Sequence, residues 1–134
     1  MTKSSPAPIL NTSLPGSFRQ IRIELAREAG HPDGAHGIAY VMVAPLDDDA
    51  HIDVELWRQH REACRVARLR PSAATVHGHL VHRRGGTWAF QYDANIPDES
   101  GFHFAEERFV PGEYVSINEE GRMHPFRIVS VARL

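Results

Sequence analysis

Several predicted strands of this chain are apolar on both faces, and this limits the folds that it can adopt. Residues 38–44 read IAYVMVA, and residues 126–131 also carry apolar side chains on both faces. A sheet with one solvated face alternates apolar and polar residues instead. The pattern predicts a small α+β fold, in which a strongly coiled or barrel-like, mainly antiparallel sheet of six to seven strands packs against one amphipathic helix.

Turns rich in glycine and proline separate the predicted strands. Besides residues 38–44, strands are expected at 76–82, 87–93, 113–117 and 123–131, with a short candidate at 102–109. The segment Arg83-Arg84-Gly85-Gly86 is expected to be a hairpin turn, and residues 94–101 an acidic loop. Trp88, Phe90 and Tyr92 share one face of their strand, where we expect them to belong to the core.

Residues 18–28 fit two kinds of secondary structure. Apolar residues at every second position from 21 to 25 give the spacing of a strand. Ser17 with Gln20 also fits a helix capping box, so a helix is the alternative. We expect the strand, joined to residues 38–44 as a hairpin.

The amphipathic helix is predicted at about residues 54–68. Asp53 is a suitable N-cap, and Ile52 with Trp57 can form a hydrophobic staple. Apolar or small residues recur on one side of this segment, and arginines recur on the other. Pro71 requires the helix to end before it.

Charge is distributed unevenly along the chain, although the net charge is only −2. Residues 58–84 contain seven arginines and one acid, whereas residues 91–120 contain eight acids and one arginine. The two blocks can pair inside the fold, or the basic block can face an anionic protein or nucleic acid. On the second interpretation, the anionic partner is bound by Arg58, Arg61, Arg65, Arg68, Arg83 and Arg84.

Histidines suggest a divalent metal as an alternative. His77 and His79 share a face of one predicted strand, and His60 and Cys64 share a face of the predicted helix. If the helix packs on that strand, the side chains form a zinc site. The candidate ligands are His77, His79, His82, His60 and Cys64. On the other interpretation, Cys64 and His60 are part of the helix core.

A calcium loop is not predicted from the acidic run before the helix. Asp47, Asp49 and Asp53 have the spacing of the first ligands of an EF-hand. Ile52 and Arg58 stand where that loop needs glycine and glutamate. We therefore expect a solvated loop that ends at a helix N-cap.

The chain is expected to have a flexible tail at residues 1–17 and a single globular domain at 18–134. One cysteine, no signal-peptide pattern and no apolar run of membrane-spanning length indicate a cytoplasmic protein without a membrane partner. All basic residues except Lys3 are arginine, which is typical of a GC-rich bacterial source.

These patterns favour a binding or interaction domain that docks an anionic partner through an arginine-rich helix face. The alternative is a metal-binding protein or a metal-dependent enzyme that uses the histidines. Self-association through an exposed strand edge or an aromatic face is a third hypothesis.

Overall fold

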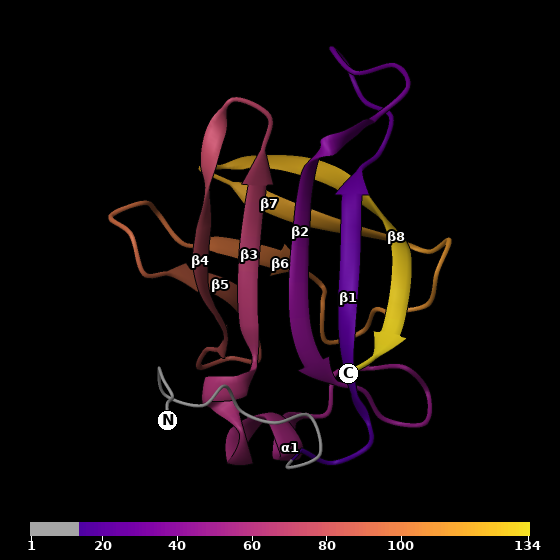
Figure 1. Ribbon diagram of the computed structural model, residues 1–134, viewed down its shortest axis with the longest axis vertical. Coiled ribbons are helices and arrows are strands. Elements are labelled where there is room, and N and C mark those ends of the chain that lie inside the picture. Colours follow the sequence, from indigo (N-terminus) through magenta and orange to yellow (C-terminus); the bar gives the residue numbers. More distant parts are fainter. Residues whose placement is uncertain (1–13) are drawn as a thin grey trace, which may run out of the picture.

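Eight strands form one closed antiparallel barrel. The computed structural model describes residues 14–134. Each strand pairs with the next along the chain, and β8 pairs with β1 to close the barrel (Figure 1). The strands are β1 (Phe18–Leu25), β2 (Ala35–Pro45), β3 (Arg65–Arg70), β4 (Ala73–His82), β5 (Trp88–Tyr92), β6 (Glu99–Phe102), β7 (Tyr114–Glu119) and β8 (Arg122–Arg133). The barrel-like antiparallel sheet is confirmed, but it has eight strands rather than six or seven.

Residues 18–28 fitted either a strand or a helix, and the structure has a strand there, β1. β1 pairs with both β2 and β8, and Ile21 has Met42 and Val131 as its Cα partners on the two sides. Ile21, Ile23 and Leu25 are buried, as the alternating pattern requires. The strand is confirmed, because two neighbouring strands bind its backbone and the barrel interior takes its apolar side chains.

The helix predicted at 54–68 is wrong in its length. α1 covers only Val54–Gln59, a 3-10 turn (η2, Arg61–Ala63) follows, and the remaining residues enter β3. The N-cap is as expected, since Asp53 Oδ1 accepts a hydrogen bond from the Leu56 amide at 3.1 Å. β3 pairs with β2 on one side and β4 on the other, so pairing overrides the helical pattern. The expected arginine-rich helix face is therefore absent from the described chain.

The segment before β7 also differs from the prediction. Residues 99–102 form β6, although most of them were expected to belong to an acidic loop. The strand predicted at 102–109 is wrong beyond Phe102, since residues 103–113 contain no strand. The acidic character of residues 94–101 led us to expect a loop where β6 lies. Glu99 instead points into the barrel and is only 3% exposed. Its polarity suggested the surface, but internal hydrogen bonds hold it inside.

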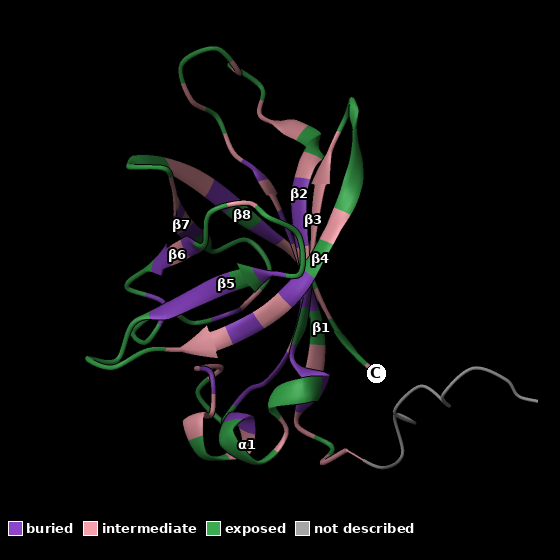
Figure 2. Cartoon of the chain, turned by 90° about the vertical axis from the view of Figure 1, so that its left-hand side faces the viewer, coloured by how far each residue is buried: buried purple, intermediate pink, exposed green. Residues whose placement is uncertain are grey.

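Large side chains fill the barrel. Trp88, Phe90 and Tyr92 are buried, as expected, and β5 is mostly buried along its length in Figure 2. The Tyr40 ring packs against Phe90 and against Phe126, with both pairs of ring centroids 5.1 Å apart. The interior of an eight-stranded barrel is just wide enough to be filled in this way.

The two ends of the barrel are built differently. α1 lies across one end (Figure 1), where the Trp57 ring meets Trp88 edge to face at 5.3 Å. Phe104 and Phe109, from the segment after β6, are buried with their ring centroids 5.3 Å apart. The turn between β3 and β4 lies at the opposite end (Figure 1).

The chain before β1 was predicted to be a tail. Residues 1–13 of that prediction lie outside the described residues. In the described part, the Ser17 carbonyl accepts a hydrogen bond from the Leu46 amide at 3.1 Å. No helix within residues 14–134 is long and apolar enough to cross a membrane.

Substituting Gly78 with alanine should destabilise the barrel. A Cβ at this position would lie 2.7 Å from Tyr92 Cα and still closer to the Gln91 carbonyl oxygen, so β4 and β5 would have to separate. We expect Gly78→Ala to lower the free energy of unfolding by about 1–3 kcal/mol, as overpacking does. Urea denaturation measures this, with Gly16→Ala as the control, because a Cβ at Gly16 meets nothing within 4 Å. Equal stability of the two variants would contradict the close approach.

Candidate functional site

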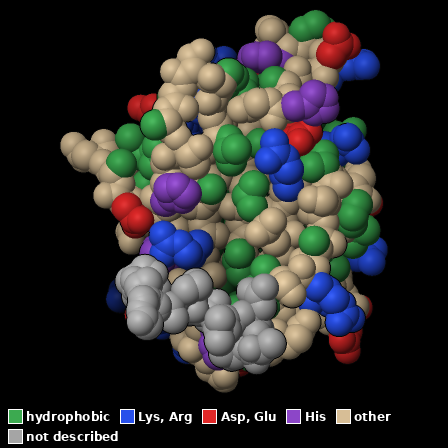
Figure 3. All heavy atoms as spheres, in the orientation of Figure 1, with side chains coloured by type: hydrophobic (Ala, Val, Ile, Leu, Met, Phe, Trp, Pro, Cys, Tyr) green, Lys and Arg blue, Asp and Glu red, His purple; other side chains and the backbone are tan. Residues whose placement is uncertain are grey.

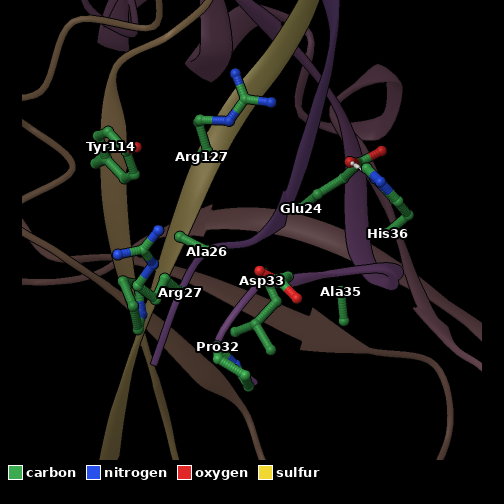
Figure 4. A pocket seen from close by; sticks show the side chains of 11 residues that line it. Glu24, Ala26, Arg27, Pro32, Asp33, Ala35, His36, Tyr114 and Arg127 are labelled. Atoms are coloured by element: carbon green, nitrogen blue, oxygen red, sulfur yellow. Dashed lines mark hydrogen bonds and ion pairs between the residues drawn. The ribbon is translucent and has the colours of Figure 1, made fainter. Parts of the chain in front are cut away.

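A groove of about 510 Å³ lies outside the barrel, beside the loop that joins β1 to β2 (Figure 4). Its walls come from the end of β1, this loop, the start of β2, and strands β7 and β8. The lining residues include Glu24, Arg27, Asp33, His36, Tyr114 and Arg127. Tyr114 and Arg27 lie on one side of the groove in Figure 4, and Glu24 and His36 lie on the other.

One acidic residue of the groove, Glu24, is already paired. Glu24 Oε2 accepts a hydrogen bond from Arg22 Nε at 2.7 Å, and Glu24 Oε1 lies 2.7 Å from His36 Nδ1. Burial alone would raise the pKa of Glu24, but these two hydrogen bonds outweigh it and the pKa is lowered. Glu24 is therefore an ionised, compensated carboxylate rather than a proton donor.

The basic wall is not paired. Arg27 and Arg127 form no ion pair with any other residue between 14 and 134. Register places the Arg127 backbone between Glu24 of β1 and Tyr114 of β7. Tyr114 is 57% exposed, which is unusual for a large aromatic side chain in this barrel. The wall thus offers two guanidinium groups and a free aromatic ring.

A second polar cluster lies inside the barrel around Glu99. Glu99 Oε1 accepts hydrogen bonds from the hydroxyls of Tyr40 at 2.7 Å and Tyr92 at 2.6 Å. Glu99 Oε2 accepts one from Arg68 Nε at 3.2 Å. A buried carboxylate is tolerated only with such a set of donors, and here both oxygens are engaged.

The cluster continues toward the barrel end that lies away from α1. The Glu119 carboxylate accepts a hydrogen bond from Arg68 Nη2 at 2.5 Å and lies 3.5 Å from Arg70 Nη2. Arg70 Nη2 also donates to the Tyr40 hydroxyl at 3.2 Å. The side chains of Arg68, Arg70 and Glu119 are 17%, 16% and 28% exposed, so solvent reaches the outer part of the cluster.

The ionisation of this cluster follows from its burial. Burial raises the pKa of Tyr92 and of Tyr40 well above the ordinary tyrosine value, and the Glu99 charge adds to the shift. Burial alone would lower the pKa of Arg68, but Glu99 and Glu119 raise it on balance. The tyrosines are therefore neutral donors, and Arg68 stays charged.

The two charge blocks of the sequence pair with each other. Four arginines of the basic block form ion pairs with acids of the second block: Arg65 with Asp93, Arg68 with Glu99 and Glu119, Arg70 with Glu119, and Arg83 with Asp98. The interpretation that the blocks pair inside the fold accounts for these arginines. Over β1–β4, the arginines visible in Figure 3 are separated by other side chains and form no continuous basic patch.

The arginines proposed for an anionic partner are not on one surface. Arg58 lies on α1 and pairs with Glu55, Arg61 lies on η2, and Arg65 and Arg68 lie on β3, where Arg68 faces inward. Arg83 and Arg84 form the turn after β4. Of the six, only Arg61 and Arg84 have no ion pair within the described residues. The Arg61 guanidinium lies 4.8 Å from the centroid of the Trp57 ring.

The candidate metal ligands do not converge on one point. Cys64 is buried and its thiol donates to the His60 carbonyl at 3.6 Å, whereas the His60 ring packs edge to face against Phe18. His79 lies near Arg65 and Asp93 on the outer side of β4, and the His82 ring packs against Trp88. His77 is exposed. Metal binding by these residues stays a prediction.

Burial raises the pKa of the Cys64 thiol to about 12. A thiol with so high a pKa is protonated at neutral pH, which makes it a poor nucleophile.

Within residues 14–134, one group of three metal-binding side chains does converge, and it is Asp47, Asp49 and His51. Asp47 Oδ1 in this loop accepts hydrogen bonds from the backbone amides of Asp49 and His51. These bonds shape the loop that leads to the α1 cap, as expected for the acidic run.

Sequence reasoning missed both polar sites, although Arg68 was among the arginines proposed to bind an anionic partner. Tyr114 and Arg127 lie on the two strands of one hairpin, but Arg27 lies far from both along the chain, and no motif links it to them. Glu99 and Glu119 were counted in the acidic block, and the opposed charge of the two blocks was the one signal that pointed to them. Comparison with models of protein families, with curated proteins and with solved structures found no match for this chain.

The buried tyrosine hydroxyls should make the barrel sensitive to alkali. Tyr92 keeps its proton when folded but loses it near pH 10 when unfolded, so its stabilising contribution is complete below pH 10 and declines as the pH rises. Tyr92→Phe removes this group. Above pH 10 the free energy of unfolding of the variant should therefore fall less steeply with pH than that of the parent protein, and the two slopes should differ by about 1.4 kcal/mol per pH unit. Urea denaturation at pH 9 to 11.5 measures the slope. Tyr114→Phe, which removes an exposed tyrosine, should keep the slope of the parent protein, and equal slopes for both variants would contradict the burial argument.

Proposed function

We propose that this barrel is a binding domain that takes a small anionic ligand in the groove bordered by Arg27 and Arg127. The observation that carries the proposal is that two guanidinium groups from different segments border one groove without an acidic partner in the described chain. Arginine is suited to this role because its planar fork binds carboxylate and phosphate oxygens in pairs. Since large side chains fill the barrel interior, the groove is the better place for a ligand.

The dimensions and lining of the groove define the class of ligand. Its volume of about 510 Å³ falls within the range of about 300–1,000 Å³ that is usual for small-molecule sites. The exposed Tyr114 ring beside Arg127 favours a ligand that joins its anionic group to a flat or apolar part. Asp33 and the ionised Glu24 also line the groove, and they disfavour a second anionic group on the ligand.

The groove predicts where a small aromatic anion binds and which charge holds it. Benzoate and adenosine 5′-monophosphate serve as probes, titrated into the protein at constant ionic strength and followed by two-dimensional NMR. We expect saturable shifts at residues lining the groove. Arg127→Gln should weaken the affinity about tenfold, which corresponds to about 1.4 kcal/mol for one lost charged hydrogen-bond donor.

The matched control is Arg122→Gln, which removes an exposed arginine from the same strand but outside the groove. It should leave the affinity of the probe unchanged. If neither probe shifts the residues of the groove, or if both variants weaken binding equally, the proposal is wrong.

A second candidate function is the docking of a larger anionic partner near α1. It is favoured by the placement of Arg61, which lies over Trp57 without an acidic partner in the described chain and borders a smaller groove of about 310 Å³ with His79 and His82. Arg84 is the other unpaired arginine of the proposed set. A metal-binding function remains an alternative, and metal analysis of the purified protein tests it directly.

The salt dependence of nucleic-acid binding shows how many arginines take part. With only Arg61 and Arg84 free, we expect the logarithm of the binding constant for a single-stranded oligonucleotide to fall with the logarithm of salt concentration with a slope of about −1.4. Contact by all six arginines would give a slope of about −4.2. Fluorescence anisotropy at 50 to 300 mM salt distinguishes these cases, and the absence of binding would remove nucleic acid as the partner.

A further inference from the structure

The two carboxylates inside the barrel are held in different ways. Glu99 is 3% exposed and accepts hydrogen bonds from two tyrosines as well as from Arg68. The Glu119 side chain is 28% exposed, and within residues 14–134 the partners of its carboxylate are only Arg68 and Arg70. Glu99 therefore belongs to the packed core, whereas Glu119 sits between two arginines as a bound anion would.

We propose that Arg68 and Arg70 form an oxyanion-binding site at the mouth of the barrel, that the chain's own Glu119 fills this site, and that a carboxylate or phosphate from solution takes its place. The site is separate from the groove at Arg27 and Arg127 and does not depend on the function proposed there.

The backbone around Glu119 suits this exchange. Glu119 is the last residue of β7, and the turn that follows consists of Glu120 and Gly121, both with positive φ angles of 51° and 83°. The side chain leaves the site by rotating about its own bonds into solvent, so no strand has to separate. Glu99 has no such route, because its carboxylate lies on the inner side of β6 beneath Tyr40 and Tyr92.

Charge balance defines the ligand. Arg68 and Arg70 carry two positive charges, and Glu99 and Glu119 carry two negative charges. When Glu119 turns outward, one guanidinium charge is left uncompensated in a partly buried position. A single negative charge restores the balance, which favours a carboxylate or a singly charged phosphate. The neutral hydrogen-bond partners of Arg70 are the Leu69 carbonyl, at 2.8 Å from Nη1, and the Tyr40 hydroxyl, at 3.2 Å from Nη2.

The test compares Glu119→Gln with Glu120→Gln. Both variants remove one negative charge at neighbouring positions, but Glu120 forms no ion pair within the described residues. Inorganic phosphate and acetate are the two probes, titrated at constant ionic strength in chloride, and the side-chain NMR signals of Arg68 and Arg70 are the readout. If Glu119 fills the site in about nine-tenths of the molecules, its removal should strengthen binding about tenfold.

We expect saturable shifts of both arginine signals at about tenfold lower probe concentration in Glu119→Gln than in the parent protein, with Glu120→Gln unchanged. A response to acetate alone identifies a carboxylate site, and a response to phosphate alone identifies a phosphate site. If Glu119→Gln responds no better than Glu120→Gln, the proposal is overturned.

The parent protein supplies a test that does not depend on the stability of the variant. If Glu119→Gln does not fold, the titration of the parent protein decides. Saturable shifts of the Arg68 and Arg70 signals with either probe support the site, and their absence overturns it.

Discussion

The arrangement of this barrel depends on the hydrogen bonds that the buried carboxylate of Glu99 accepts. It lies inside a barrel filled with aromatic and aliphatic side chains and receives hydrogen bonds from β2, β3 and β5 through Tyr40, Arg68 and Tyr92. Burying this carboxylate without these donors would lower the free energy of unfolding by several kcal/mol. A slip of β6 by one residue would turn Glu99 to the outside and leave the donors without their acceptor, so this contact fixes the register of a strand only four residues long.

The same contact explains why the charges of the chain are grouped into two blocks. β3 supplies Arg68 and Arg70 to the interior, and β6 and β7 supply the acids that meet them from the other side of the barrel. Charged side chains can occupy inward positions only when opposite charges arrive from elsewhere in the sheet. Four of the seven arginines of the basic block pair with acids of the second block, and within this block only Arg61 and Arg84 have no ion pair in the described chain.

Closure of the barrel also removes two surfaces that the sequence suggested for self-association. β1 and β8 pair with each other, so every described strand has a neighbouring strand on both sides. The aromatic face of β5 points into the core, so it offers no exposed surface. Self-association itself stays a prediction. The aromatic side chains that do reach solvent are Phe102 and Tyr114 on β6 and β7, and Tyr114 is part of the groove proposed to bind an anion.

The sequence by itself determined the β-rich character of the fold, the first hairpin, the cap at Asp53 and the inward face of β5, because each depends on local alternation or on a residue beside its own backbone. Only the tertiary structure decided that residues 65–70 and 99–102 form strands. Both segments carry charged residues at inward positions, where a local pattern predicts solvent. Their conformation as strands depends on partners that lie 31 and 51 positions away, as Arg68 does on Glu99 and Glu119. The groove was hidden for the same reason, since the β7–β8 hairpin brings Tyr114 and Arg127 together but Arg27 joins them only when β8 closes the barrel against β1.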